Sequence, residues 1–248
     1  MQAALPAKLK DDAIVEALVE IQFDSDDIGE IVIGRLSDSE LWNGYSAQRL
    51  SASNIPENIR DNDPALRFQP IIERRSQDSK SNVRIGSHVL SYHVYAPYPG
   101  WPEFKSRLES IIETLFNLTN NLRVTRLGLR YINYLDMEKH HIGSLKDLTL
   151  NIQRKEDSIV SGFNLAYIDV PSTQHHVLTR IATPDFIDVN SRPKDIVGAV
   201  DIDVFTTKDF VSDNALAVKQ WLTKAHDIEK DAFFCLFEQK TLDQLIEE

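Results

Sequence analysis

Two arginines and two aspartates are the residues of this chain whose types and spacing best suit ligand chemistry. Arg126 and Arg130 are four positions apart in a strand-like segment, so their side chains share one face, with Gly128 between them. Asp201 and Asp203 are two positions apart in another such segment and also share a face. The arginines could clamp an anion or a carboxylate, because Gly128 would let a ligand or a second backbone approach closely.

The same four residues also have a structural interpretation. Cross-strand ion pairs between arginine and aspartate are ordinary in sheets, and nothing nearby reads as a phosphate-binding loop. We favour this interpretation. A Mg²⁺ site would need Asp185 or Asp195 as a third ligand, and two alternating aspartates are common on any solvated strand face. The four residues are thus the candidate ligand-binding residues, and no catalytic residue, metal ion or cofactor is predicted.

The histidines and the single cysteine form no recognisable catalytic pattern. His175 and His176 are adjacent in a strand-like segment, so they point to opposite faces and cannot easily share one metal ion. His226 is expected to be a half-buried, hydrogen-bonded imidazole on a helix. Cys235 lies among aromatic residues and is predicted to be a buried structural thiol. The glycine-rich motifs of nucleotide-binding loops and of nucleophile elbows are absent from the sequence.

Hydrophobic periodicity defines the elements that must position these residues. Residues 13–23 and 124–136 alternate with a period of two, which predicts half-buried strands. Residues 102–118 place apolar side chains at helical spacing on one face, which predicts an amphipathic helix with Pro102 in its first turn. The other predictions are strands near 44–51, 66–75, 82–95 (with a bulge at Gly86), 159–168, 174–183 and 196–206, a loop over 52–65, and helices over 28–35, 144–152, 213–228 (continuing or kinking into 229–239) and 241–247.

The order of these elements is similar in the two halves of the chain. A strand, a strand and a helix that start near residues 13, 87 and 101 have counterparts near 124, 198 and 212. Side-chain identity between the halves is negligible, so a coincidence of two common patterns is the alternative. We expect an α+β fold with two pseudo-equivalent halves, 1–122 and 123–248, each a mainly antiparallel sheet with a covering helix. The two sheets could join into one compact unit across the first strands.

Charge and composition limit the possible functions. The 248 residues carry a formal net charge of −11, which opposes direct binding to nucleic acid because phosphate neutralisation needs a basic surface. No apolar run approaches the roughly 20 residues of a membrane helix. The first residues lack the basic and apolar regions of a secretion signal, and one cysteine excludes an internal disulfide framework. A cytoplasmic protein is expected.

Three segments resemble a sporadically distributed family of bacterial and archaeal proteins. They are residues 98–104 (YPGWPEF), residues 126–133 (RLGLRYIN) and residues 225–234, which begin AHD and end FF. The resemblance covers nearly the whole chain. The family has no assigned activity and no accepted catalytic residues, so the resemblance carries over no site. Its patchy distribution implies mobile accessory genes or genes linked to defence.

The leading functional hypothesis is a non-enzymatic binding or regulatory subunit of a bacterial defence or toxin–antitoxin-like assembly. Its expected partner is a protein, such as a basic effector or toxin, because the chain is acidic. Direct binding to nucleic acid or to a membrane is not expected, and a homodimer is compatible with the sequence. The alternative is a small-ligand or nucleotide sensor, or an enzyme, that uses the face of Arg126, Arg130, Asp201 and Asp203. The hypotheses differ in whether these side chains contact one another or line an open cavity.

Overall fold

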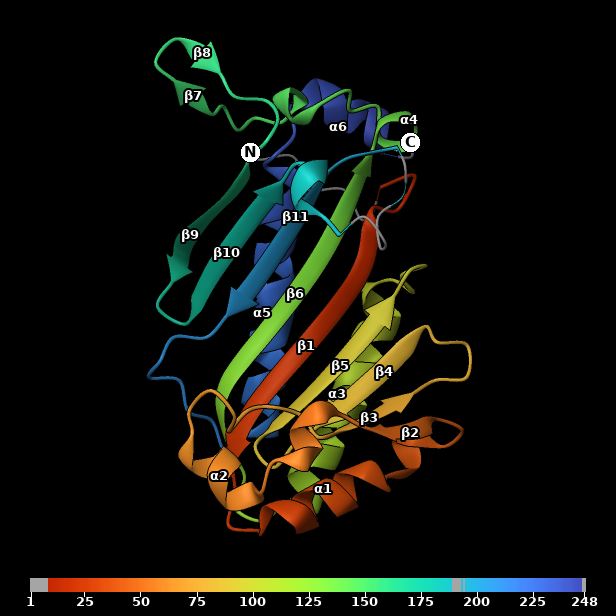
Figure 1. Ribbon diagram of the computed structural model, residues 1–248, viewed down its shortest axis with the longest axis vertical. Coiled ribbons are helices and arrows are strands. Elements are labelled where there is room, and N and C mark those ends of the chain that lie inside the picture. The colour runs from red at the N-terminus through yellow and green to blue at the C-terminus, as the bar shows by residue number, and fades with distance from the viewer. Residues whose placement is uncertain (1–8, 189–192, 194, 247–248) are drawn as a thin grey trace.

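A nine-stranded antiparallel sheet dominates the computed structural model, which describes residues 9–188, 193 and 195–246 (Figure 1). Its strands are β1 (Ile14–Asp24), β2 (Ser46–Arg49), β3 (Ile72–Arg75), β4 (Ser81–Ile85), β5 (Val89–Tyr95), β6 (Arg123–Asp136), β9 (Asn164–Ser172), β10 (His175–Ala182) and β11 (Ile196–Phe205). The helices are α1 (Gly29–Ser37), α2 (Glu57–Asn62), α3 (Trp101–Leu118), α4 (Met137–His140), α5 (Ala215–Phe234) and α6 (Gln239–Leu245). A separate hairpin is formed by β7 (Gln153–Arg154) and β8 (Asp157–Ser158). The α+β class predicted from the sequence is confirmed.

The two long strands β1 and β6 form the middle of the sheet. The strand order is β2-β3-β4-β5-β1-β6-β11-β10-β9. Glu20 of β1 lies opposite Gly128 of β6, and Leu18 lies opposite Arg130. The sheets of the two halves therefore join across their first strands, as the sequence allowed. The order of strands outward from this pair is comparable on both sides, but an internal duplication of the chain stays a prediction.

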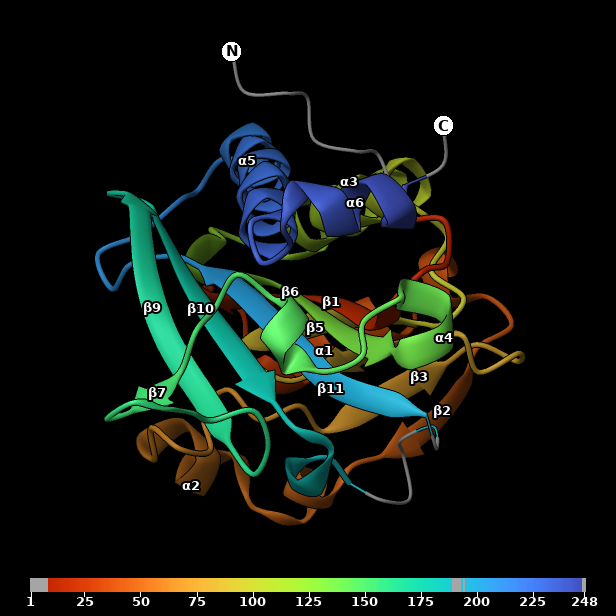
Figure 2. The ribbon, with the colours of Figure 1, turned by 90° about the horizontal axis from the view of Figure 1, so that it is seen from above.

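The helices α3 and α5 pack side by side on one face of the sheet, with α6 beside them (Figure 2). The stripe of α3 predicted to be buried is buried, and consists of Phe104, Leu108, Ile111, Ile112 and Leu115. Alternate residues of the central strands, including Val19 and Leu129, meet these helices and are almost fully buried. Each large side chain buried in this way stabilises the fold by roughly 1.5–3 kcal/mol. We call the opposite sheet surface the outer face.

The segments on either side of Gly86 were predicted incorrectly. Residues 82–95 form two strands, β4 and β5, with a tight connection at Gly86 in place of a bulged single strand. A Cβ on Gly86 would lie 2.7 Å from the carbonyl oxygen of Gln69, so this close backbone approach explains the glycine. The predicted strand over 66–75 is confined to β3. The predicted loop over 52–65 contains α2, whose short polar sequence gives no hydrophobic period.

The C-terminal half also differs from the predictions in detail. The expected helix over 144–152 is a single 3₁₀ turn, Leu145–Asp147, with Ser144 and Asp147 forming a capping box. Helix α5 runs without a break to Phe234. Cys235 is exposed, contrary to the predicted buried thiol, because Phe233, Phe234 and Leu236 take the inward positions at this helix end. No helix in the part of the chain that the structure describes is both long and apolar enough to cross a membrane.

Candidate functional site

The four candidate residues of the sequence come together on the outer face as a network of ion pairs. Arg130 donates two hydrogen bonds to the carboxylate of Asp201, from Nε at 2.6 Å and from a terminal nitrogen at 2.7 Å. Arg180 of the neighbouring strand β10 approaches the same carboxylate to 3.7 Å. The bidentate pair raises the pKa of Arg130, so this guanidinium is occupied by a protein carboxylate.

The second arginine is also paired within the chain. Arg126 donates a hydrogen bond of 2.9 Å to the carboxylate of Glu20 on β1, and its other terminal nitrogen lies 3.9 Å from Asp203. Burial raises the pKa of the Asp203 carboxyl, with the nearby arginines opposing that rise. A Cβ on Gly128 would lie 3.3 Å from the Arg126 guanidinium, so this side chain occupies the space expected for a ligand.

The side chains of this network therefore contact one another, as the structural interpretation requires. Nor do the aspartates support the Mg²⁺ alternative: across residues 9–188, 193 and 195–246, no cluster of three or more His, Cys, Asp or Glu residues is arranged to hold a metal ion. The histidines expected to diverge do so, since His175 is buried and stacks on Trp221 whereas His176 packs on Phe205 of the outer face.

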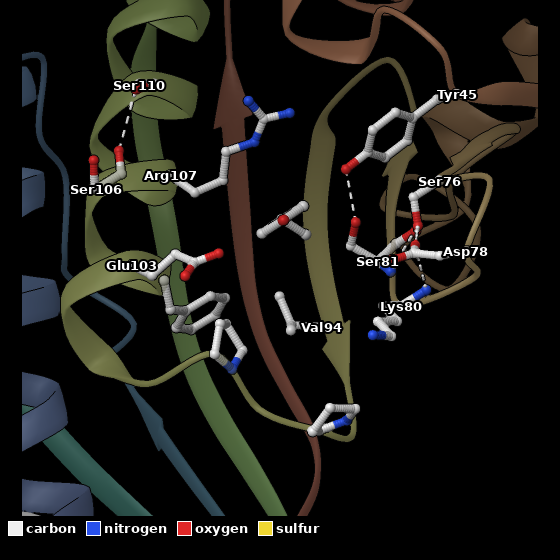
Figure 3. Close-up of a pocket in the computed structure, with 14 residues that line it drawn as sticks. Tyr45, Ser76, Asp78, Lys80, Ser81, Val94, Glu103, Ser106, Arg107 and Ser110 are labelled. Carbon is white, nitrogen blue, oxygen red and sulfur yellow. Dashed lines mark hydrogen bonds between the residues drawn. The ribbon is translucent and has the colours of Figure 1, made fainter.

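A groove of about 800 Å³ lies between α3 and the β3–β4 connection (Figure 3). Glu103 and Arg107 project from α3 on one side, and Tyr45 and Ser81 lie on the other (Figure 3). The Tyr45 hydroxyl is 2.6 Å from the Ser81 hydroxyl, while the Arg107 guanidinium donates to the carbonyl oxygen of Leu41 and lies over the ring of Trp42. The side chains of Tyr45, Ser81 and Arg107 are thus engaged in contacts within the chain.

A smaller cavity, of about 350 Å³, lies between the start of β1, the start of α3 and the C-terminal half of α5. We name it the Glu229 cavity. Its lining combines aromatic, apolar and titratable side chains: Leu9, Lys10, Asp12, Ala13, Ile14, Pro97, Tyr98, Pro99, Gly100, Trp101, Tyr131, Asn133, His226, Glu229, Lys230, Phe233 and Phe234. Its volume lies at the lower end of the range for small-molecule sites.

Glu229 is the most unusual residue of this lining. It is 6 % exposed, and its carboxyl makes no hydrogen bond or ion pair with any residue that the structure describes. Burial raises the pKa of this carboxyl to about 8 and outweighs the opposing charge of the Lys230 ammonium. At neutral pH the group is therefore mainly protonated and uncharged.

Two phenols and an imidazole face the same space. The hydroxyls of Tyr98 and Tyr131 are 3.1 Å apart, and that of Tyr131 is 3.5 Å from Nδ1 of His226. Burial is the largest cause that raises the pKa of both phenols. Burial lowers the pKa of His226 to about 4, so this imidazole is neutral at pH 7. The phenols and the imidazole thus offer uncharged hydrogen-bonding groups at pH 7.

Local structure explains how the chain places these groups. Pro102 follows Trp101 in the first turn of α3, and Gly100 adopts a positive φ of 92° that turns the chain into the helix. His226, Glu229 and Phe233 recur at helical spacing on one face of α5. Tyr131 and Asn133 project from alternate positions of β6 toward the same helix, and both are buried.

This site lies outside the candidate residues predicted from the sequence. Its available signal was Glu229 itself, an acidic residue on the apolar stripe formed by Val218, Trp221, Leu222, Ala225 and Phe233. His226 was identified only as a half-buried, hydrogen-bonded imidazole, which it is. The three segments that carry the family resemblance, residues 98–104, 126–133 and 225–234, all contribute to the cavity lining.

Comparison with known proteins adds no assignment. No protein-family model matches the sequence, and no curated protein is significantly similar to it. The resemblance to the sporadic family therefore stays a prediction, and the argument for function depends on the geometry of the Glu229 cavity.

Proposed function

We propose that this chain is a non-enzymatic binding protein that takes up a small organic molecule in the Glu229 cavity. The observation that supports the proposal is a buried carboxyl with no partner among the described residues, aimed into a cavity with aromatic walls. Leaving a buried polar group unpaired costs roughly 1–3 kcal/mol. A buried titratable group with a strongly shifted pKa in a cavity is therefore a candidate for ligand binding. In the free protein both Glu229 and His226 are mainly uncharged at pH 7, so the empty cavity needs no counter-ion.

Trp101 gives a direct way to test this proposal. It is one of three tryptophans and it lines the cavity, whereas Trp42 and Trp221 are buried elsewhere in the core. We would screen a chemically diverse set of fragments by thermal shift and record tryptophan emission for those that stabilise the protein. Stabilising fragments should change the emission of the wild type and leave that of Trp101→Phe unchanged.

A space-filling variant provides the control. Ala13 lines the cavity and is 3 % exposed, so Ala13→Leu should fill part of it. Fragments that stabilise the wild type should lose this effect in Ala13→Leu while the variant remains folded by circular dichroism. A set of fragments that stabilises both proteins equally, with no change in Trp101 emission, would show that this cavity is not the site.

The outer face supports a second candidate function, recognition of a partner protein. Its ion pairs are partly accessible: the side chains of Arg126, Arg130 and Glu20 are each about a third exposed. With a net charge of −11, the favoured partner is a basic protein, such as an effector or toxin of a bacterial defence or toxin–antitoxin-like assembly. In this role the chain is a regulatory subunit, and ligand binding in the Glu229 cavity regulates its association with the partner protein.

Association with such a partner should weaken with added salt, chiefly through a slower on-rate. Cross-linking and mass spectrometry on the complex should place the contacts on the outer face. Glu20→Lys should slow association, while Glu113→Lys, the same charge change on α3, should have a smaller effect. Equal effects of the two substitutions would argue against the outer face as the binding surface.

A further inference from the structure

The charges around Glu229 indicate what kind of ligand completes the cavity. The titratable groups that face it are Tyr98 from the loop before α3, Tyr131 from β6, and His226 and Lys230 from α5. The phenols and the imidazole are neutral at pH 7. Lys10 and Asp12, both exposed, line the cavity from the segment before β1.

The cationic side chains of the lining, Lys10 and Lys230, form no ion pair with Glu229 in the part of the chain that the structure describes. Lys230 follows Glu229 directly on α5 and is half-buried, and its charge lowers the pKa of the Glu229 carboxyl against the larger effect of burial. Residues adjacent on a helix point about 100° apart, which disfavours a close ion pair between the Lys230 ammonium and the Glu229 carboxyl. A positive charge that pairs with Glu229 therefore has to arrive with the ligand.

The aromatic walls of the Glu229 cavity also favour a positively charged ligand. Phe233, Phe234 and Tyr98 border the cavity, and Trp101 stacks one face on His226. Aromatic faces attract cations, and the attraction is stronger where water is excluded. An apolar group on the ligand would at the same time contact the phenylalanine rings.

We propose, on the basis of the small-molecule function above, that the Glu229 cavity binds an organic cation. Its charged nitrogen, an amine or an amidine, pairs with the Glu229 carboxylate, and its apolar part packs against Phe233 and Phe234. Binding then transfers the Glu229 proton to solvent, because a cation in the cavity favours the ionised carboxyl. The number of protons released on binding is a direct measure of this pairing.

Benzamidine and benzamide form a matched pair of probes. Benzamidine is cationic from pH 6 to pH 9, whereas benzamide has nearly the same shape and no charge. Titration calorimetry in buffers of different ionisation enthalpy should show about one proton released when benzamidine binds at pH 7. Benzamidine affinity should increase by roughly tenfold per pH unit up to about pH 8 and then level off.

Two variants separate the role of Glu229 from general effects of charge. The glutamine of Glu229→Gln has nearly the shape of the protonated carboxyl, so the variant should fold. At pH 9 it should bind benzamidine at least roughly tenfold more weakly than the wild type does, and its affinity should not depend on pH. Asp231→Asn makes the same charge change at an exposed position of α5 and should preserve the pH dependence.

The outcomes distinguish this inference from the function on which it depends. Binding of benzamide as tightly as benzamidine, or benzamidine affinity that does not change with pH, would overturn the cation assignment and leave the small-molecule function in place. Failure of both probes to bind at millimolar concentration would also overturn the cation assignment. The function itself would then be decided by the fragment screen with Trp101→Phe and Ala13→Leu.

Discussion

Trp101 and His226 stack with their ring centroids 3.9 Å apart and their planes 14° from parallel. The contact joins the first residue of α3 to the middle of α5 and is the one ring contact between these two helices among the described residues. It also fixes the imidazole so that Nδ1 lies 3.5 Å from the Tyr131 hydroxyl. One aromatic pair therefore couples the packing of the helices to the geometry of the Glu229 cavity.

His226→Phe should keep the stacking and change the acid sensitivity of the protein. The folded-state pKa of about 4 lies below the usual 6.5, so the unfolded chain binds a proton that the folded chain does not. Wild-type stability is therefore lost as the pH falls from about 6.5 towards 4. The variant has no imidazole to protonate, so its free energy of unfolding should fall by roughly 1–2 kcal/mol less than that of the wild type over this pH range. The difference is limited to this size because the imidazole is only partly buried.

Urea unfolding at pH 7 and pH 4.5 would measure this difference, with His176→Phe on the outer face as the control. Equal pH dependence in the wild type and in His226→Phe would mean that His226 titrates normally in the folded protein.

Glu229→Gln should change stability in the opposite pH range. The folded carboxyl has a pKa of about 8 against a usual 4.5, so between these values the folded state holds a proton that the unfolded state has lost. Wild-type stability therefore falls as the pH rises from about 4.5 to 8 and then levels off. The variant lacks this fall, and should be more stable than the wild type by roughly 3 kcal/mol at pH 8.

Unfolding curves of the two proteins at pH 5, 6.5 and 8 would test the prediction, with Asp231→Asn as the matched control. A stability difference between wild type and Glu229→Gln that stays constant across these pH values would contradict it.

Leu108→Ala and Ile112→Ala should each destabilise the protein by roughly 2–4 kcal/mol, because both side chains are buried on the inner stripe of α3. Ser106→Ala, at an exposed position of the same helix, should change stability by less than about 0.5 kcal/mol. Thermal melts that rank these variants differently would show that α3 packs through another face.

A double-mutant cycle on Arg130 and Asp201 should give a coupling energy of roughly 1 kcal/mol, since the pair is bidentate but partly exposed. Arg130→Gln and Asp201→Asn are the single variants. The coupling should decrease in high salt. A coupling energy of zero at low salt would mean that the ion pair does not hold β6 to β11.

The two halves should superpose. Aligning residues 13–118 with residues 124–229 should bring β1 onto β6 and α3 onto α5 with one rotation. Since α3 and α5 lie on the same face of the sheet, the arrangement permits such an axis (Figure 2). An alignment that matches the strands but leaves the helix axes crossing at a large angle would reject duplication.

Much of the fold could be predicted because its signals are local. Alternation in β1 and β6 and the apolar stripe of α3 each report the burial of a single element. The hairpin at Gly86 and the helix α2 were missed, since close backbone approach and short polar helices leave no period in the sequence. The pairing of Arg130 with Asp201 was favoured from their shared faces, and the structure places them in contact.

The Glu229 cavity could not be predicted in the same way. Its lining comes from the segment before β1, from β6, from the start of α3 and from α5, and only the tertiary arrangement brings these together. The sequence signal of the cavity was one acidic residue, Glu229, on an apolar helical stripe. From the sequence, such a residue could equally lie at the exposed border of the stripe, because a helical period alone does not define how far the buried face extends.

The pairing of β1 with β6 has a consequence for the protein during its synthesis. β6 begins at Arg123, after β2 to β5 and α3, so it leaves the ribosome only when the rest of the first half has already emerged. Until then, β1 has β5 on one side and an open row of backbone donors and acceptors on the other, which can pair with another nascent chain. β6 then presents an open edge of its own until β11 emerges, so the growing sheet exposes an unpaired edge through much of the synthesis of the second half.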